Sequence, residues 1–239
     1  MRHVEFVMGT AVTFDLPDHT DVGVLVDAIE RLHDIDQRYS VFRPDSQISS
    51  IGKGTLPLAS ADADVQAVLA TCHDLYVATS GAFCHWPGGR ERPLDPSGYV
   101  KGWAIDQVVA DLHQAGVERF FINAGGDIVA YSASDPWRIG IRHPSDPSAV
   151  GAVLECTNLA VATSANYERG DHIWGADHHV LTSITVTGPT LGVADALATA
   201  LWSVDQSNPE WLAQFPSYEV LTFDCHQRRH RTAGLTLVS

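Results

Sequence analysis

Apolar side chains recur at helical spacing in several long segments of the chain. Residues 21–37 place them three or four positions apart, and the same spacing returns at 65–76, 100–115 and 190–204. Such spacing puts the apolar side chains on one face of an α-helix, where a core can cover them. The pattern therefore predicts helices in these segments, with Gly81 available as a left-handed cap after the second helix.

Shorter segments alternate between apolar and polar residues and predict strands. Glycine or proline turns separate several of them, as in antiparallel hairpins. The expected strands are residues 3–16, divided at the Met8-Gly9-Thr10 turn, and residues 119–122, 128–131, 137–142, 150–155, 159–163, 181–186, 218–223 and 234–238. Helices that alternate with clusters of such strands favour an α+β fold with mostly antiparallel sheets over a doubly wound parallel sheet. No linker divides the chain, so we expect a single domain over residues 1–239.

The apolar run from Gly188 to Val204 contains one charged residue, Asp195. In a helix, Asp195 and Thr199 are one turn apart and project from the same face. A buried carboxylate needs a partner, and oxygen ligands on one face suit a hard cation such as Mg²⁺. The alternative is that Asp195 caps a helix that begins late, while Thr199 bonds to the carbonyl four residues earlier. The run by itself does not separate these two interpretations.

Composition limits the classes of partner. With 15 Lys and Arg against 29 Asp and Glu, the formal net charge is -14, which argues against binding nucleic acid or an anionic membrane through a general basic surface. The sequence lacks an apolar stretch of membrane-spanning length and an N-terminal signal pattern, so we expect a cytoplasmic protein. Its four cysteines form no C-x-x-C pair and are expected to be reduced.

Polar stretches elsewhere offer candidate chemistry. Residues 95–106 place Asp95, Lys101 and Asp106 near a helix N-terminus, which can hold a phosphate, although Asp95 as a cap with Lys101 in water would produce the same pattern. The glycine turn at 123–127 fits either an anion contact or an ordinary hairpin. In the run 164–179 a histidine can act as a general base, but the spacing does not indicate zinc.

Taken in order, these stretches resemble the ApbE-type FAD:protein FMN transferases over nearly the whole chain. The resemblance rests on Met8-Gly9-Thr10, SVFRPDSQIS, the GAF at 81–83, DPSGYVKGWAID, NAGGD, ATSANYERG with the histidine that follows, and ADALAT. It implies an ApbE-like fold with a ligand cleft between two lobes. It also implies Mg²⁺-dependent transfer of FMN from FAD to a Thr or Ser hydroxyl of a target flavoprotein, with release of AMP.

The same resemblance assigns site residues. It makes Asp195 and Thr199 side-chain ligands of the metal, with the main-chain carbonyl of Gly98 as a third ligand, and makes His172 the base that acts together with Asp195 in catalysis. The residues that it places around FAD are Met8, Phe42, Ala82, Phe83, Asp95, Lys101 and Ile173.

The chain departs from the family pattern at several positions. Cys84-His85 follow the GAF motif where an aspartate is common, and Ala198 stands where some members have a second acid. The segment 174–177 replaces a common Asp-Pro-x-Thr-Gly. These changes leave two alternatives open: hydrolysis of FAD to FMN and AMP, and flavin binding without catalysis.

Overall fold

A computed structural model describes residues 1–86, 93–165 and 180–238. Within these residues, the strands are mostly antiparallel neighbours in one eight-stranded sheet, ordered β1-β2-β3-β4-β7-β8-β9-β10, and a separate pair, β5-β6. The strand bounds are β1 Arg2–Val7, β2 Thr10–Asp15, β3 Arg119–Ala124, β4 Asp127–Ser132, β5 Trp137–His143, β6 Asp146–Cys156, β7 Asn158–Ala165, β8 Leu181–Gly188, β9 Glu219–Asp224 and β10 Arg229–Arg231. The expectation of antiparallel sheets in an α+β fold is confirmed.

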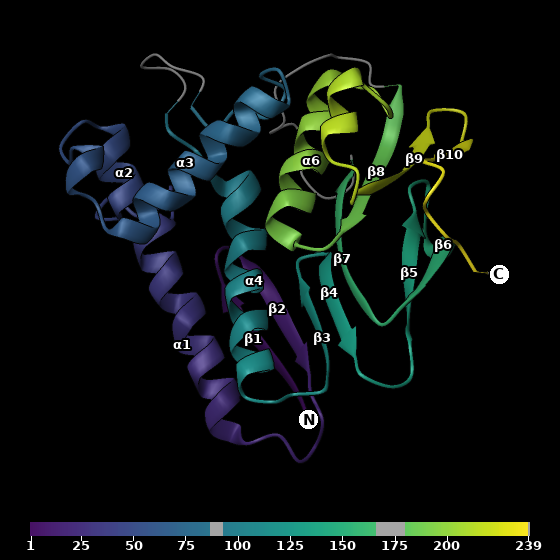
Figure 1. Ribbon diagram of the computed structural model, residues 1–239, viewed down its shortest axis with the longest axis horizontal. Helices are drawn as coiled ribbons and strands as arrows, with labels where there is room; N and C mark the ends of the chain where they lie inside the picture. The colour runs from purple at the N-terminus through teal and green to yellow at the C-terminus, as the bar shows by residue number, and fades with distance from the viewer. Residues whose placement is uncertain (87–92, 166–179, 239) are drawn as a thin grey trace.

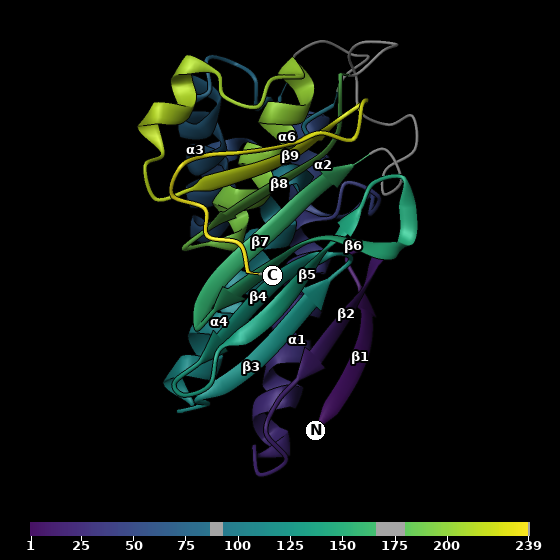
Figure 2. The ribbon, with the colours of Figure 1, turned by 90° about the vertical axis from the view of Figure 1, so that its right-hand side faces the viewer.

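Helices cover one face of the large sheet, and the β5-β6 pair covers part of the other (Figures 1 and 2). The helical bounds are α1 Val22–Tyr39, α2 Gln47–Gly52, α3 Ala63–Ala78, α4 Ser97–Gln114 and α6 Leu191–Val204, with short 3₁₀ segments at Leu58–Ser60 and Glu210–Gln214. The main core lies between the sheet and the helices, and a smaller core lies under β5-β6. None of the helices in the described ranges is both long and apolar enough to cross a membrane.

The four predicted helices are confirmed at their expected positions as α1, α3, α4 and α6. Helix α4 begins at Ser97, earlier than residue 100, where the apolar spacing begins. After α3, both Ser80 and Gly81 adopt positive φ, and the amide of Gly81 donates to the carbonyl of Tyr76 at 2.8 Å. All four cysteines are free thiols.

One strand prediction is wrong. Residues 234–238 form only an isolated bridge, Val153 with Val238, and the last strand is β10. Apolar alternation at 234–238 reflects Leu235 and Leu237 packing against the small core under β5-β6. The polar sequence of β10 suits its position at an exposed edge of the sheet, where charged side chains discourage pairing with another chain.

Helices α4 and α6 approach each other at glycines. A Cβ added at Gly102 would lie 2.5 Å from the carbonyl oxygen of Leu191, and one added at Gly192 would lie 3.0 Å from the amide nitrogen of Trp103. Only residues without a side chain permit this separation. The contact holds the first turns of α4 against α6.

Asp106 connects the same two helices. Its carboxylate accepts hydrogen bonds from the amides of Leu191 and Gly192, both at 2.8 Å, and so caps α6, whose own N-cap residue, Thr190, makes no side-chain cap. Asp106 therefore belongs to the scaffold and not to the N-terminus of α4, where the sequence grouped it. Burial raises the pKa of this carboxyl to about 6, although the two amide hydrogen bonds oppose the shift.

We expect Asp106→Asn to change how stability depends on pH. A carboxyl whose folded-state pKa is raised contributes stability that is complete below its usual pKa of 3.8 and is lost as pH rises through about 6. That contribution reaches up to about 3 kcal/mol and is absent from the asparagine variant. Urea unfolding at pH 4 and pH 7 should show that wild type loses stability relative to Asp106→Asn over this range. An unchanged difference at both pH values would contradict the assignment.

Candidate active site

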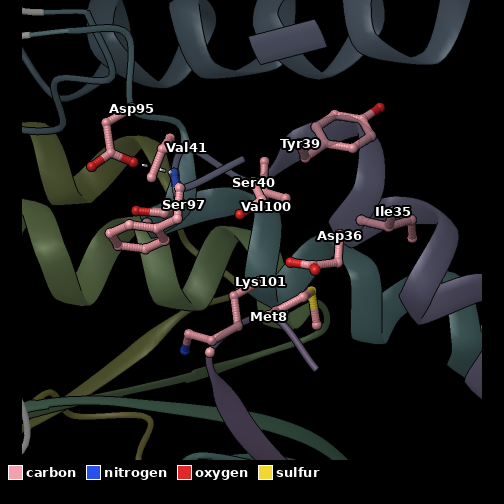
Figure 3. A pocket seen from close by; sticks show the side chains of 13 residues that line it. Met8, Ile35, Asp36, Tyr39, Ser40, Val41, Asp95, Ser97, Val100 and Lys101 are labelled. Atoms are coloured by element: carbon pink, nitrogen blue, oxygen red, sulfur yellow. Dashed lines mark hydrogen bonds between the residues drawn. The ribbon is translucent and has the colours of Figure 1, made fainter. Parts of the chain in front are cut away.

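A pocket of about 510 Å³ opens where the β1–β2 turn, the end of α1 and the start of α4 meet. Figure 3 shows Met8, Asp36 and Lys101 lining it from these three elements. The structure brings together here five of the residues predicted for the site from separate parts of the sequence. They are Met8, Phe42, Asp95, Gly98 and Lys101.

Met8 and Gly9 form the tight turn between β1 and β2. Both have positive φ, 54° and 72°, as in a type I′ hairpin turn. This conformation is uncommon for a residue other than glycine and persists where the surrounding structure determines it. Six consecutive pairs between β1 and β2, ending at Val7 with Thr10, hold the turn and present Met8 to the pocket.

Phe42 lies at the rim of the pocket with 91% of its surface exposed. An exposed aromatic ring contributes little to a core, so its place here is suited to a ligand with a flat apolar surface.

The segment before α4 is held by its own polar groups. The amide of Asp95 donates to the carbonyl of His85 at 2.8 Å, and the carboxylate of Asp95 accepts from the amide of Ser97 at 3.0 Å. The N-cap of α4 is Pro96, without a side-chain cap, so the interpretation of Asp95 as the cap is wrong; Asp95 instead bonds within the segment before the helix and lines the pocket. Gly98 and Lys101 follow on the first turns of α4, where amide groups and the helix dipole favour an anion.

Asp195 lies in the second turn of α6 and is only 1% exposed. The helix begins at Leu191 with Thr190 as its N-cap, so the interpretation of Asp195 as a late cap is wrong. Among the described residues, the hydroxyl of Thr199 is buried with no hydrogen-bond partner, so the predicted bond to the preceding turn is also absent. A Cβ added at Gly98 would lie 3.3 Å from this hydroxyl. Gly98 of α4 therefore adjoins Thr199 of α6.

Lys101 does not face water, as the simpler interpretation of this helix start required. Its side chain is 21% exposed, and its ammonium forms ion pairs with Asp195, at 3.1 Å, and with Asp127 at the start of β4. The other oxygen of Asp127 accepts from the amide of Thr163 at 2.9 Å. Sequence reasoning did not assign Asp127; the available signal was an acid that enters an apolar strand directly after two glycines.

The remaining predicted residues lie elsewhere. Ala82 and Phe83 are not among the side chains that line the pocket. Phe83 is buried, lies near Gly98 and stacks on His85. It therefore packs against the start of α4 and does not line the pocket. Burial also lowers the pKa of His85. His172 and Ile173 fall outside the described residues.

The donor set at α4 and α6 fits a hard cation better than zinc. In the described parts of the chain, no group of three or more His, Cys, Asp or Glu could hold a metal ion. Asp195 instead offers a carboxylate that is paired with Lys101, and Thr199 offers a buried hydroxyl that has no hydrogen-bond partner among the described residues and lies next to Gly98. Oxygen donors of this kind are the ligands that Mg²⁺ prefers.

Comparison with known proteins gives consistent matches. The model of the ApbE family matches residues 8–85 and 88–222. The "FAD:protein FMN transferase" of Rhodobacter capsulatus is 36% identical over 122 residues, 45% of this chain and 23% of that protein. The protein of the same name from Haemophilus influenzae is 33% identical over 128 residues, 46% of this chain and 37% of that protein. The chain thus spans less than half the length of these curated relatives.

Solved structures match over more of the chain. The ApbE protein of Thermotoga maritima superposes with a TM-score of 0.80 at 19% identity, covering 98% of this chain and 97% of that one. The flavin transferase ApbE from Vibrio cholerae gives a TM-score of 0.79 at 21% identity, with the same coverage. At this identity the likeness concerns the fold.

Proposed function

Because the chain belongs to the ApbE family, we propose that it transfers the FMN part of FAD to a Thr or Ser hydroxyl of a target flavoprotein, in a Mg²⁺-dependent reaction that releases AMP. The observation that carries the proposal is the meeting of Asp195 and Thr199 with Gly98 directly beside a pocket that contains Phe42 and Lys101. Two helices that are distant in sequence bring these groups together.

The proposed metal ligands are the Asp195 carboxylate, the Thr199 hydroxyl and the main-chain carbonyl of Gly98. When bound there, Mg²⁺ would offset the negative charge of the FAD pyrophosphate. A protein of net charge -14 needs such local compensation to hold a dianion. Lys101 and the amides at the start of α4 add to it, and Phe42 stacks on a ring of the flavin nucleotide.

In the proposed reaction, the acceptor oxygen forms a bond to the FMN phosphorus while the bond from that phosphorus to the bridging oxygen breaks. The hydroxyl proton passes to a base, for which His172 remains the prediction, and AMP leaves. Holding the reacting groups in line and stabilising charge supply most of the catalysis in phosphoryl transfer.

The test is mass analysis of a candidate acceptor flavoprotein after incubation with this chain, FAD and Mg²⁺. We expect the acceptor to gain the mass of FMN less one water, with one AMP released per modified chain. An acceptor in which valine replaces the target threonine is the control. Rapid AMP release without any acceptor would indicate FAD hydrolysis instead, and FAD binding with no AMP under any condition would indicate a non-catalytic flavin-binding protein.

Phe42→Ala should weaken FAD binding about tenfold, because stacking of a base on an aromatic side chain is worth ~1–3 kcal/mol. Since Phe42 is 91% exposed, the free energy of unfolding should change by less than ~0.5 kcal/mol. Flavin fluorescence titration measures the first quantity and urea unfolding the second.

The matched control for this prediction is Phe6→Ala. Phe6 is 77% exposed on β1 and does not line the pocket, so its replacement should leave FAD affinity unchanged. Equal effects of the two substitutions would show that Phe42 has no specific contact with the flavin nucleotide.

A further inference from the structure

Asp36 presents a carboxylate to the pocket from the last turn of α1. Figure 3 shows its side chain pointing away from the helix, on the side where Met8 lies. The residue is partly buried, and its carboxylate makes no hydrogen bond or ion pair with any residue that the structure describes. Asp34, two residues earlier on the same helix, pairs instead with Arg38 at 2.6 Å.

The position of Asp36 does not stabilise the helix. An acid in the last turn lies at the negative end of the helix dipole, where it is unfavourable. A partly buried carboxylate also loses water that no described residue replaces, and this loss costs free energy. Residues that carry such a cost are expected at functional sites, where a ligand completes their hydrogen bonds. Asp36 therefore points to a ligand that donates hydrogen bonds.

Two helices bring opposite polarity to the same pocket. The first turns of α4 supply amide groups and the ammonium of Lys101, whereas the end of α1 supplies Asp36 and the last carbonyl groups of the helix. A phosphate is favoured beside α4 and disfavoured beside α1. Hydroxyl groups, which donate hydrogen bonds to a carboxylate, suit the end of α1. The pocket thus fits a ligand in which hydroxyl groups lie close to a phosphate.

We propose that Asp36 binds a vicinal diol of FAD and accepts one hydrogen bond at each of its carboxylate oxygens. This inference rests on the proposed function. FAD carries neighbouring hydroxyls on both sides of its pyrophosphate, in the ribose of the AMP half and in the ribityl chain of the FMN half. An acid that accepts from ribose hydroxyls also occurs in dinucleotide-binding folds. Asp36 then selects dinucleotides whose hydroxyls are free, because a phosphate on them would meet a negative charge.

Asp36→Asn tests the proposal by the sign of its effect. If Asp36 only lines the pocket, removing its negative charge near a dianionic pyrophosphate strengthens FAD binding. If Asp36 holds the diol, the variant loses two charge-assisted hydrogen bonds. We expect FAD to bind about tenfold more weakly to Asp36→Asn than to wild type, as measured by flavin fluorescence titration in the presence of Mg²⁺. Equal or tighter binding overturns the inference.

Two FAD analogues locate the diol. With a 2′-deoxyadenosine analogue of FAD, the difference between wild type and Asp36→Asn should shrink to threefold or less if the diol belongs to the AMP half. The same reduction with a 4′-deoxyribityl analogue would assign it to the FMN half. A tenfold difference that persists with both analogues means that Asp36 contacts another group of FAD, which overturns the inference.

Asp34→Asn is the matched control. It removes the same charge from the same helix, but Asp34 pairs with Arg38 and does not line the pocket. Its replacement should change FAD affinity by less than twofold. If both variants weaken FAD binding equally, the effect comes from α1 or from overall charge, and the inference is wrong. Circular dichroism should show both variants folded.

Titration of wild type separates this failure from that of the proposed function. A wild-type chain that binds no FAD overturns the proposed function, and the role of Asp36 with it. A wild-type chain that binds FAD and modifies an acceptor, beside an Asp36→Asn variant of equal or higher FAD affinity, overturns the role of Asp36 alone.

Discussion

Asp195→Asn should reduce FMN transfer by about 1,000-fold and abolish the binding of Mn²⁺, used as a probe for Mg²⁺, to the FAD-free chain. The substitution keeps the size of a side chain that is 1% exposed but removes the only charge among the proposed metal ligands. Removing one preorganised electrostatic contact from an active site commonly costs 10²–10³-fold in rate, and loss of a charged metal ligand should lie at the upper end. The measurement is the initial rate of acceptor modification at saturating FAD and Mg²⁺.

The control for this prediction is Asp224→Asn at the end of β9, which changes another buried acid, one that contacts Arg228 and accepts hydrogen bonds from main-chain amides. It should retain most of the transfer activity. Circular dichroism should show both variants folded. If Asp195→Asn keeps more than about a tenth of the wild-type rate, the assignment of Asp195 to the metal is wrong.

Gly102→Ala should lower the free energy of unfolding by about 3 kcal/mol, at the upper end of the cost of overpacking. The added Cβ would lie 2.5–2.7 Å from backbone atoms of Leu191 and Gly192, which cannot rotate aside as a side chain can. Helix α4, with Gly98 and Lys101, would have to move away from α6. FMN transfer should therefore fall even at temperatures where the variant is fully folded.

Helix propensity predicts the opposite sign, because alanine in a helix is favoured over glycine by roughly 1 kcal/mol. Urea unfolding therefore decides between packing and propensity. Gly140→Ala on β5 is the control, since its added Cβ would meet only the Val150 side chain at 3.5 Å. A stabilised Gly102→Ala variant would contradict the close contact of the two helices.

Local sequence patterns predicted the positions of the helices well, but they did not predict which segments pair as strands at the edges of the sheet. The 3.6-residue spacing located α1, α3, α4 and α6, because burial on one face constrains residues only a turn apart. The same reasoning failed at 234–238, where apolar alternation reflects packing on a small core and not strand pairing. Edge strand β10 is polar and short, so it has no alternating pattern to detect.

For the site, the order of motifs grouped Met8, Phe42, Asp95, Gly98 and Lys101, and the pocket contains them all. The family pattern also placed Ala82 and Phe83 in the site, but neither lines the pocket. Phe83 is instead buried in the core next to Gly98. Asp127 was overlooked because a glycine turn followed by an acid is common in ordinary hairpins.

The sequence by itself determined that a single acid, Asp195, stands in an apolar helix with Thr199 on the same face, since helical geometry relates residues four positions apart. Only the tertiary structure decided what that acid meets. The helix begins at Leu191, which excludes a cap, and the glycine contact with α4 brings Gly98 and Lys101 to it. The pairing of Lys101 with Asp127 joins a helix to a strand, and no periodicity within either element encodes a contact between them.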